Sequence, residues 1–279
     1  MLALVNKIIP FSSVDGPGNR TAIFLQGCNF NCQYCHNPET IKVCVHCGAC
    51  LDYCPTGALY REGGKVQYDF TKCVLCDECF KHCPHSSSPR IRLMTPQDVM
   101  RQVDRNMPFI RGITVSGGEC TQQAGFLYEL LTLARKKGLD TLLDSNGSYD
   151  FSKDEKLLNV TDGVMLDVKA WDMQEHLRVT GCSNELVLSN LRFLAEIGKL
   201  EEVRTVIVPE LFDTEDTVRQ VSRALVPHLQ TRSIRYKIIA YRPMGVRSEY
   251  QSLRSPAREE LEKHERIARA EGMRDIVLI

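Results

Sequence analysis

Cysteine spacing is the feature that most constrains this chain. Eleven of its thirteen cysteines fall into three closely spaced groups, and only Cys120 and Cys182 stand alone. The groups are Cys28, Cys32 and Cys35; Cys44, Cys47, Cys50 and Cys54; and Cys73, Cys76, Cys79 and Cys83. In a reducing compartment, thiols grouped at such short intervals indicate metal binding or catalysis rather than disulfides.

Both four-cysteine groups have the spacing C-x2-C-x2-C-x3-C, and each is followed by a proline, Pro55 or Pro84. Bacterial ferredoxins with two [4Fe–4S] clusters have this spacing, and in them the fourth cysteine of each run binds the cluster of the other run. The predicted ligand sets are therefore Cys44, Cys47, Cys50 and Cys83, and Cys54, Cys73, Cys76 and Cys79. Two structural zinc sites are the alternative, but zinc modules usually pair C-x2-C units that lie about 12–20 residues apart.

Composition argues against several classes of partner. The 279 residues carry 35 basic and 35 acidic side chains, which leaves no electrostatic basis for binding nucleic acid or an anionic membrane. No apolar run approaches the roughly 18 residues of a membrane span, and the first ten residues do not resemble a signal peptide. We therefore expect a cytoplasmic protein with neither nucleic acid nor a membrane as partner.

Strand and helix patterns alternate outside the cysteine-rich segment 36–90. Apolar segments predict strands at 21–27, 113–119, 139–147, 163–169, 203–209 and 234–242. Helices are expected near 95–106, 121–137, 214–226 and 256–271. About six such units, with polar residues following the strands, favour a partial (β/α)6 TIM-like barrel over a Rossmann sheet. The predicted α/β barrel comprises residues 1–35 and 91–279, and residues 36–90 form a ferredoxin-like insert held by its clusters.

The first cysteine group has the spacing C-x3-C-x2-C and directly follows a predicted strand. Three thiolates leave one iron of a four-iron cluster open to an external ligand. This spacing, with Tyr34 before the last cysteine, resembles the signature of the radical S-adenosylmethionine (SAM) superfamily. The resemblance implies that SAM binds the open iron and is cleaved to methionine and a 5′-deoxyadenosyl radical. The segment Ser116–Glu119 resembles the GGE motif of that superfamily, in which glycines let the backbone approach a ligand closely.

Further motifs resemble the activating enzymes of glycyl radical enzymes, including the pyruvate formate-lyase-activating enzymes. The segment Asp15–Arg20 is similar to their D-G-P-G-x-R motif. Other matches are DSNG at 144–147, MLDVK at 165–169, H-x3-T-G-x2-N at 176–184 and R-x-V-x-x-P at 204–209. The runs at 5–20 and 24–41 are similar to the YjjW-type activating enzymes.

The resemblance assigns roles to individual side chains. It places Tyr34, Gly117, Gly118, Glu119, Asp144, Asp167, Lys169, Arg204 and Val206 at the cofactor, with Lys169 also acting in catalysis beside Cys28, Cys32 and Cys35. It also implies a monovalent cation, Na⁺ or K⁺, bound by Asp144, Ser145, Met165 and Asp167. Alternatively, Asp144 and Asp167 merely cap the ends of strands. Arg242 departs from the family pattern, in which histidine follows the tyrosine, so no role is assigned to it.

The expected activity is radical transfer to a protein. The implied cofactors are three [4Fe–4S] clusters and SAM, the substrate is a backbone glycine of a glycyl radical enzyme, and the electron donor is a flavodoxin or a ferredoxin. Two alternatives stay open at this point. One is a radical SAM enzyme that acts on a small molecule, and the other is an electron-transfer protein without enzymatic activity.

Overall fold

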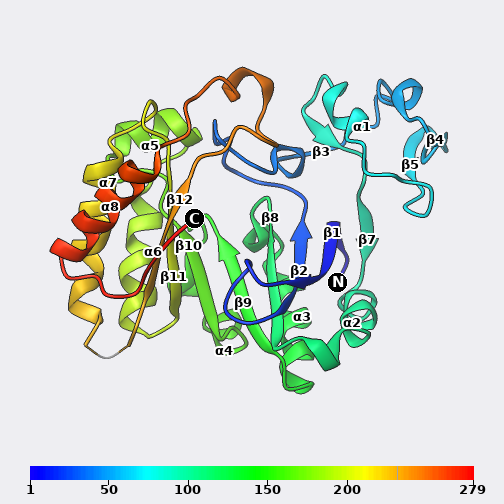
Figure 1. Cartoon of the computed structure of the whole chain (residues 1–279). Helices are drawn as coiled ribbons and strands as arrows, with labels where there is room; N and C mark the ends of the chain where they lie inside the picture. The colour runs from blue at the N-terminus through cyan, green and yellow to red at the C-terminus, as the bar shows by residue number, and fades with distance from the viewer. Residues whose placement is uncertain (231) are drawn as a thin grey trace. The chain divides into compact units, whose positions relative to one another are not determined.

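The computed structural model describes residues 1–230 and 232–279 as a mixed α/β protein (Figure 1). The chain divides into two compact units. The first unit comprises residues 1–29 and 37–133, and the second comprises residues 30–36 and 134–279. The cysteine-rich segment therefore lies in the first unit, and its description as a separate insert stays a prediction.

The first unit contains a sheet with the strand order β8-β2-β1-β7. These strands are β1 (Ala3–Ser12), β2 (Arg20–Leu25), β7 (Arg92–Met94) and β8 (Gly112–Gly117). β2 and β8 are parallel, whereas β1 is antiparallel to both β2 and β7. Strands β2 and β8 confirm the apolar predictions, since every side chain of β2 is buried. The sequence did not predict β1, because two register irregularities and several polar residues disrupt its alternation.

Helices follow the predicted capping signals. In α2 (Pro96–Asp104), the Thr95 hydroxyl accepts a hydrogen bond from the Asp98 amide at 3.1 Å, and the Asp98 carboxylate accepts one from the Thr95 amide. The helix predicted over 121–137 consists of a 3₁₀ turn, Cys120–Gln123, followed by α3 (Ala124–Lys136). Gly138 ends it with φ of +76°, a conformation that favours glycine.

The cysteine-rich segment has short elements of its own. They are the 3₁₀ turns Pro38–Thr40 and Leu51–Tyr53, helix α1 (Glu78–Lys81), and strands β3 (Lys42–Val43), β4 (Leu59–Glu62), β5 (Lys65–Tyr68) and β6 (Ser87–Ser88). β4 and β5 form an antiparallel hairpin, and Gly63 and Gly64 supply the positive φ angles of its turn. β3 pairs with β6, which brings the two ends of the segment together.

The second unit contains a parallel sheet with the order β9-β10-β11-β12-β13. Its strands are β9 (Asp140–Ser145), β10 (Gly163–Asp167), β11 (Leu200–Ile207), β12 (Arg235–Ala240) and β13 (Ile276–Leu278). Its helices are α4 (Glu155–Asn159), α5 (Met173–Thr180), α6 (Glu185–Glu196), α7 (Thr214–Leu225) and α8 (Arg258–Ala270). Helices α6, α7 and α8 lie together on one side of the sheet (Figure 1). Strands β9 to β12 and helices α7 and α8 confirm the predictions, whereas β13 was not predicted.

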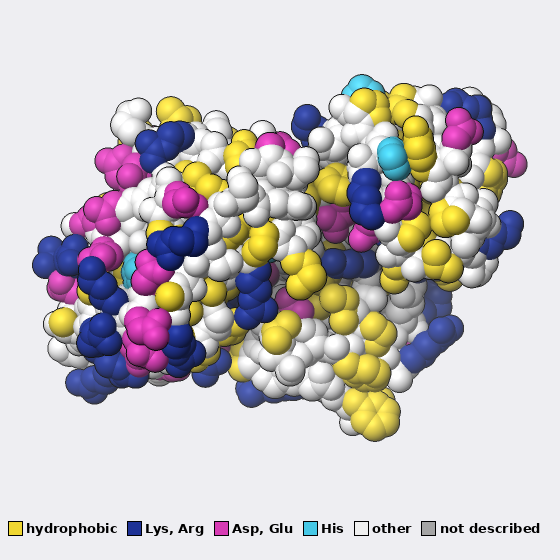
Figure 2. Space-filling view, turned by 45° about the horizontal axis from the view of Figure 1, so that its top comes forward, with side chains coloured by type: hydrophobic (Ala, Val, Ile, Leu, Met, Phe, Trp, Pro, Cys, Tyr) yellow, Lys and Arg dark blue, Asp and Glu magenta, His cyan; other side chains and the backbone are white. Residues whose placement is uncertain are grey.

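Acidic and basic side chains are interspersed on the face drawn in Figure 2, in keeping with the balanced composition. Among the described residues, no helix has both the length and the apolar character that crossing a bilayer requires.

Candidate functional site

The cysteine loop 30–36 is held by α5 in the second unit. The amide of Asn31 donates to the carbonyl of Thr180 at 2.8 Å, and the amide of Gln33 donates to that of Val179 at 3.0 Å. Carbonyls in the last turn of a helix have no partner within the helix, so they are available to fix a neighbouring segment. This contact places the predicted H-x3-T-G motif against the cysteine loop.

Arg247 holds the same loop from a distant part of the chain. Its guanidinium donates to Asn31 Oδ1 at 2.8 Å and to the carbonyl of Cys32 at 3.0 Å. The ring nitrogen Nε2 of His36 lies 2.9 Å from the carbonyl of Arg242, whose own side chain is exposed. No sequence motif indicated Arg247, because this contact joins residues that are far apart along the chain.

Cys32 lies in a buried, charged environment. Burial raises the pKa of its thiol to about 12, while the nearby Lys169 ammonium opposes this shift. Lys169 Nζ donates to Asp167 Oδ2 at 2.5 Å, and the Tyr34 hydroxyl donates to the Lys169 carbonyl at 3.3 Å. Four predicted site residues thus lie together, and metal binding at Cys32 must displace the thiol proton. Val206 packs against the same apolar core as Tyr34.

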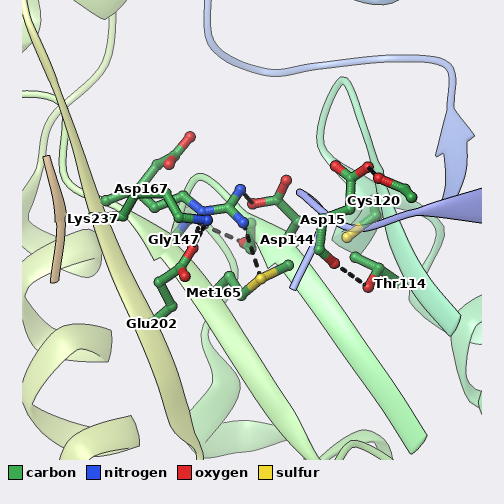
Figure 3. A network of polar contacts seen from close by, with 12 residues as sticks. Asp15, Thr114, Cys120, Asp144, Gly147, Met165, Asp167, Glu202 and Lys237 are labelled. Atoms are coloured by element: carbon green, nitrogen blue, oxygen red, sulfur yellow. Dashed lines mark hydrogen bonds and ion pairs between the residues drawn. The ribbon is translucent and has the colours of Figure 1, made fainter. Parts of the chain in front are cut away.

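A network of charged side chains crosses strands β9, β10 and β11 (Figure 3). The Arg204 guanidinium donates to Asp144 Oδ1 at 3.0 Å, to Glu202 Oε1 at 2.5 Å and to Met165 Sδ at 3.0 Å. Lys237, from β12, forms an ion pair with Glu202 at 2.9 Å. Two of the predicted cation ligands, Asp144 and Met165, therefore contact a guanidinium in this structure.

Sequence reasoning missed two members of this network. Glu202 and Lys237 are both buried, and each lies on a strand of the parallel sheet. Charged residues at buried strand positions could have signalled the network, since such groups require partners. Ser145 is another of the predicted cation ligands. Its hydroxyl accepts a hydrogen bond from the Gly147 amide at 3.1 Å.

The glycines of the predicted GGE motif end β8 in the first unit. Gly117 has φ of +124°, and a Cβ atom there would lie 2.2 Å from the carbonyl oxygen of Leu25. At Gly118 a Cβ atom would lie 2.2 Å from the carbonyl oxygen of Gly27, so larger residues are excluded. Glu119 is buried and accepts hydrogen bonds from the amide and hydroxyl of Thr121. Within this unit, the motif fixes the backbone beside the end of β2.

Cys28 lies just after the end of β2, and its amide donates to the carbonyl of Ile41 at 2.9 Å. Arg20, which ends the D-G-P-G-x-R motif, is buried and donates to Thr114 Oγ1 and to the carbonyl of Ile113. Arg20 therefore ties the start of β2 to β8. Cys120 is fully buried and Cys182 is partly buried.

The two four-cysteine runs have matching backbone conformations when Cys44 is aligned with Cys73. All four non-glycine residues with positive φ among the described residues fall within these runs or within three residues after them: His46, Leu75, Asp77 and Ser86. Their equivalents also have positive φ, since His46 matches Leu75, Gly48 matches Asp77 and Gly57 matches Ser86. Such conformations are uncommon, so their repetition indicates that both runs form the same loop.

Hydrogen bonds to sulfur repeat in the same way. The amide of His46 donates to Cys44 Sγ and the amide of Leu75 donates to Cys73 Sγ, each at 3.4 Å. The equivalent residues Cys50 and Cys79 share one small apolar core. The two runs therefore pack against each other, and an approximate twofold axis relates them.

The cysteines of the runs fall into two sets that cross between them. Burial, together with the neighbouring Cys44, Cys83 and Cys47, raises the pKa of Cys50 to about 11. The other four, Cys54, Cys73, Cys76 and Cys79, line one cavity. The predicted ligand sets divide the cysteines in the same way, and their role as cluster ligands stays a prediction. Within residues 1–230 and 232–279, no three His, Cys, Asp or Glu side chains converge as they would around a single metal ion.

The chain is similar to proteins of known family. The model of the radical SAM superfamily matches residues 22–223. The pyruvate formate-lyase-activating enzyme of Streptococcus mutans is 34% identical over 251 residues, which cover 87% of this chain and 78% of that protein. The choline trimethylamine-lyase activating enzyme of Oleidesulfovibrio alaskensis is 32% identical over 266 residues, with 88% and 85% covered. The crystal structure of QueE from Escherichia coli shares the fold, with a TM-score of 0.56, 15% identity, and 100% of this chain and 94% of that chain covered. The chain therefore belongs to the radical SAM superfamily and, within it, to the enzymes that activate glycyl radical enzymes.

Proposed function

We propose that this activating enzyme holds three [4Fe–4S] clusters, one of which binds SAM. The ligands of the SAM-binding cluster would be Cys28, Cys32 and Cys35. Three thiolates leave one iron open, and the partly buried charge pair of Asp167 and Lys169 adjoins Cys32. When it is bound and reduced, this cluster supplies the electron that cleaves SAM to methionine and a 5′-deoxyadenosyl radical, which takes a hydrogen atom from a glycine of the partner enzyme.

The protein's own residues would hold the cofactor and exclude water. Gly117, Gly118 and Glu119 would present backbone to SAM, and Tyr34, Asp144, Asp167, Lys169, Arg204 and Val206 would complete the cofactor site. A monovalent cation at Asp144, Ser145, Met165 and Asp167 remains part of the proposal. Arg204 would have to release Asp144 and Met165 for that cation to bind, because its guanidinium contacts both.

Residues 36–90 would form a ferredoxin-like insert in a partial β/α barrel. The crossed grouping of the eight cysteines supports this proposal, as do the amide donors to Cys44 and Cys73. Hydrogen bonds to cluster sulfurs are a regular feature of iron–sulfur sites. The two insert clusters would receive electrons from a flavodoxin or a ferredoxin.

The partner would be a glycyl radical enzyme, since the relatives are named for activating such enzymes. Thirteen cysteines, most of them spaced as metal ligands rather than as disulfide partners, support a reducing compartment such as the cytoplasm. Of the alternatives, a radical SAM enzyme acting on a small molecule would cleave SAM without needing a partner protein. An electron-transfer protein would not cleave SAM at all.

The deciding experiment is anaerobic reconstitution, reduction and addition of SAM together with a glycyl radical enzyme encoded beside this chain. An electron paramagnetic resonance doublet of a glycyl radical, formed in step with 5′-deoxyadenosine, supports the proposal. A Cys35→Ala variant, which lacks one ligand of the SAM-binding cluster, should form neither. Deoxyadenosine without a protein radical would reject the tested partner, and no SAM cleavage by fully loaded protein would reject the SAM site.

A further inference from the structure

The repeat of the two cysteine runs provides an internal comparison between their clusters. Arg61 and Arg90 are equivalent when Cys44 is aligned with Cys73, but their environments differ. Arg61 donates to the backbone carbonyls of Cys47 and Gly64, at 3.0 and 3.2 Å. Arg90 instead pairs with the Asp77 carboxylate at 2.5 Å and lines the cavity formed by Cys54, Cys73, Cys76 and Cys79.

One substitution within the repeat explains this difference. A Cβ atom at Gly48 would lie 2.0 Å from Nη2 of Arg61, so Arg61 occupies the space that a side chain would fill there. The equivalent position in the second run is Asp77, whose carboxylate binds Arg90. The Arg90 side chain is only 13% exposed whereas that of Asp77 is 57% exposed, so water screens the anion more than the cation.

A second donor faces the same cavity. Tyr68 lines it together with Cys73, and its hydroxyl is close enough to the Cys73 thiol to interact with it. Several other donors occur in both cysteine sets. The amides of His46 and Leu75 serve one set each, and a hydroxyl lies near Cys83 (Ser87, 3.6 Å) and near Cys54 (Thr56, 3.9 Å). Backbone groups of Thr56, Ala58 and Leu59 also hydrogen-bond to Cys54, in the same set as Cys73. Arg90 and Tyr68 are the side chains that add to this difference.

We propose that Arg90 and Tyr68 make the cluster of Cys54, Cys73, Cys76 and Cys79 the more easily reduced of the two insert clusters. Reduction adds one negative charge to a cluster, and a nearby buried cation and a hydroxyl donor both stabilise that charge. An electron delivered to the insert would therefore reside on this cluster. The inference rests on the proposed occupancy of the insert by two clusters.

The test is a potentiometric titration of the reconstituted full chain, followed by electron paramagnetic resonance. Arg90→Gln should shift the midpoint potential of one cluster to more negative values and leave the other two unchanged. Tyr68→Phe, which removes only the hydroxyl, should shift the same midpoint in the same direction by a smaller amount. Arg90→Lys, which keeps the positive charge, should shift this midpoint potential less than Arg90→Gln does. Arg61→Gln is the matched control and should leave that midpoint unchanged.

Iron content separates this inference from the proposed function. Wild-type protein should bind about twelve iron atoms, as expected for three four-iron clusters, and each variant should retain them. Wild type with about four iron atoms would reject the insert clusters themselves. If all clusters are present, unchanged midpoints in both Arg90→Gln and Tyr68→Phe would overturn the inference, and so would an equal shift in Arg61→Gln. If Arg90→Gln loses a cluster, the Tyr68→Phe midpoint decides.

Discussion

Tyr53 and His82 stack with their ring centroids 3.7 Å apart and their planes 8° from parallel. They occupy equivalent positions of the two cysteine runs, each directly before the fourth cysteine. Two equivalent residues can contact each other only near the axis that relates their segments. This contact therefore marks an approximate twofold relation within residues 36–90, and it agrees with the grouping of the fourth cysteine of each run with cysteines of the other run.

The crossed ligand sets predict how iron loss should combine in double variants. Cys44→Ala and Cys83→Ala should each remove about one third of the bound iron, because each destroys one of three clusters. The double variant Cys44→Ala/Cys83→Ala should lose no more than either single variant. Cys73→Ala/Cys83→Ala should lose about two thirds, and quantitation of iron and sulfide after anaerobic reconstitution measures this.

Uncrossed ligand sets would reverse this result. Cys73→Ala/Cys83→Ala would then lose only one cluster, and Cys44→Ala/Cys83→Ala would lose two. Cys120→Ala is a suitable control, because Cys120 is buried outside all three groups.

Arg247→Ala should make the SAM-binding cluster more labile. Arg247 donates hydrogen bonds to Asn31 and Cys32, and each such bond contributes about 1 kcal/mol to holding the loop. We expect iron to be lost to a chelator from this cluster up to about thirtyfold faster, as followed by visible absorbance. Arg254→Ala is the control, since Arg254 pairs with Glu260 on an exposed surface. Equal rates in the two variants would show that Arg247 does not hold the loop.

Glu202→Gln should destabilise the protein strongly. The Glu202 side chain is 2% exposed and pairs with both Arg204 and Lys237, so its neutralisation removes the carboxylate that pairs with Lys237 and leaves Arg204 paired with Asp144 alone. Breaking a buried ion pair costs about 3–5 kcal/mol, whereas an exposed pair contributes about 0–1 kcal/mol. Glu262→Gln, in the exposed pair with Arg258, is therefore the matched control. Anaerobic denaturant unfolding measures both, and similar losses would contradict a compensating role for Glu202.

His264 should make stability depend on pH. Burial lowers the pKa of its imidazole below 6.5, although a hydrogen bond to the Glu260 carbonyl opposes this shift. The unfolded chain therefore binds a proton that the folded chain does not, so the free energy of unfolding falls as pH drops from about 6.5 toward the folded pKa. One such group changes stability by at most about 1.4 kcal/mol per pH unit.

His264→Gln should reduce this slope, and unfolding measured between about pH 7 and pH 5 tests it. Part of the slope should remain, because burial also lowers the pKa values of His36 and His176. His85→Gln replaces an exposed histidine and is the matched control. An unaltered slope in His264→Gln would show that this imidazole does not contribute.

The sequence by itself determined the cysteine groups, most of the strands and helices, and the family. These features depend on spacing and periodicity within short segments, which a single sequence records directly. The capping box of Thr95 and Asp98 and the repeated runs 44–61 and 73–90 are examples.

Only the tertiary structure decided which distant side chains meet. Arg247 reaches the cysteine loop from near the other end of the chain. Glu202 forms ion pairs with Arg204 on its own strand, β11, and with Lys237 on the neighbouring strand, β12. Arg61 and Arg90 look equivalent in the sequence, yet one binds backbone while the other lines a cysteine cavity. No spacing rule connects such residues, because packing and the burial of charge determine their contacts once the whole chain has folded.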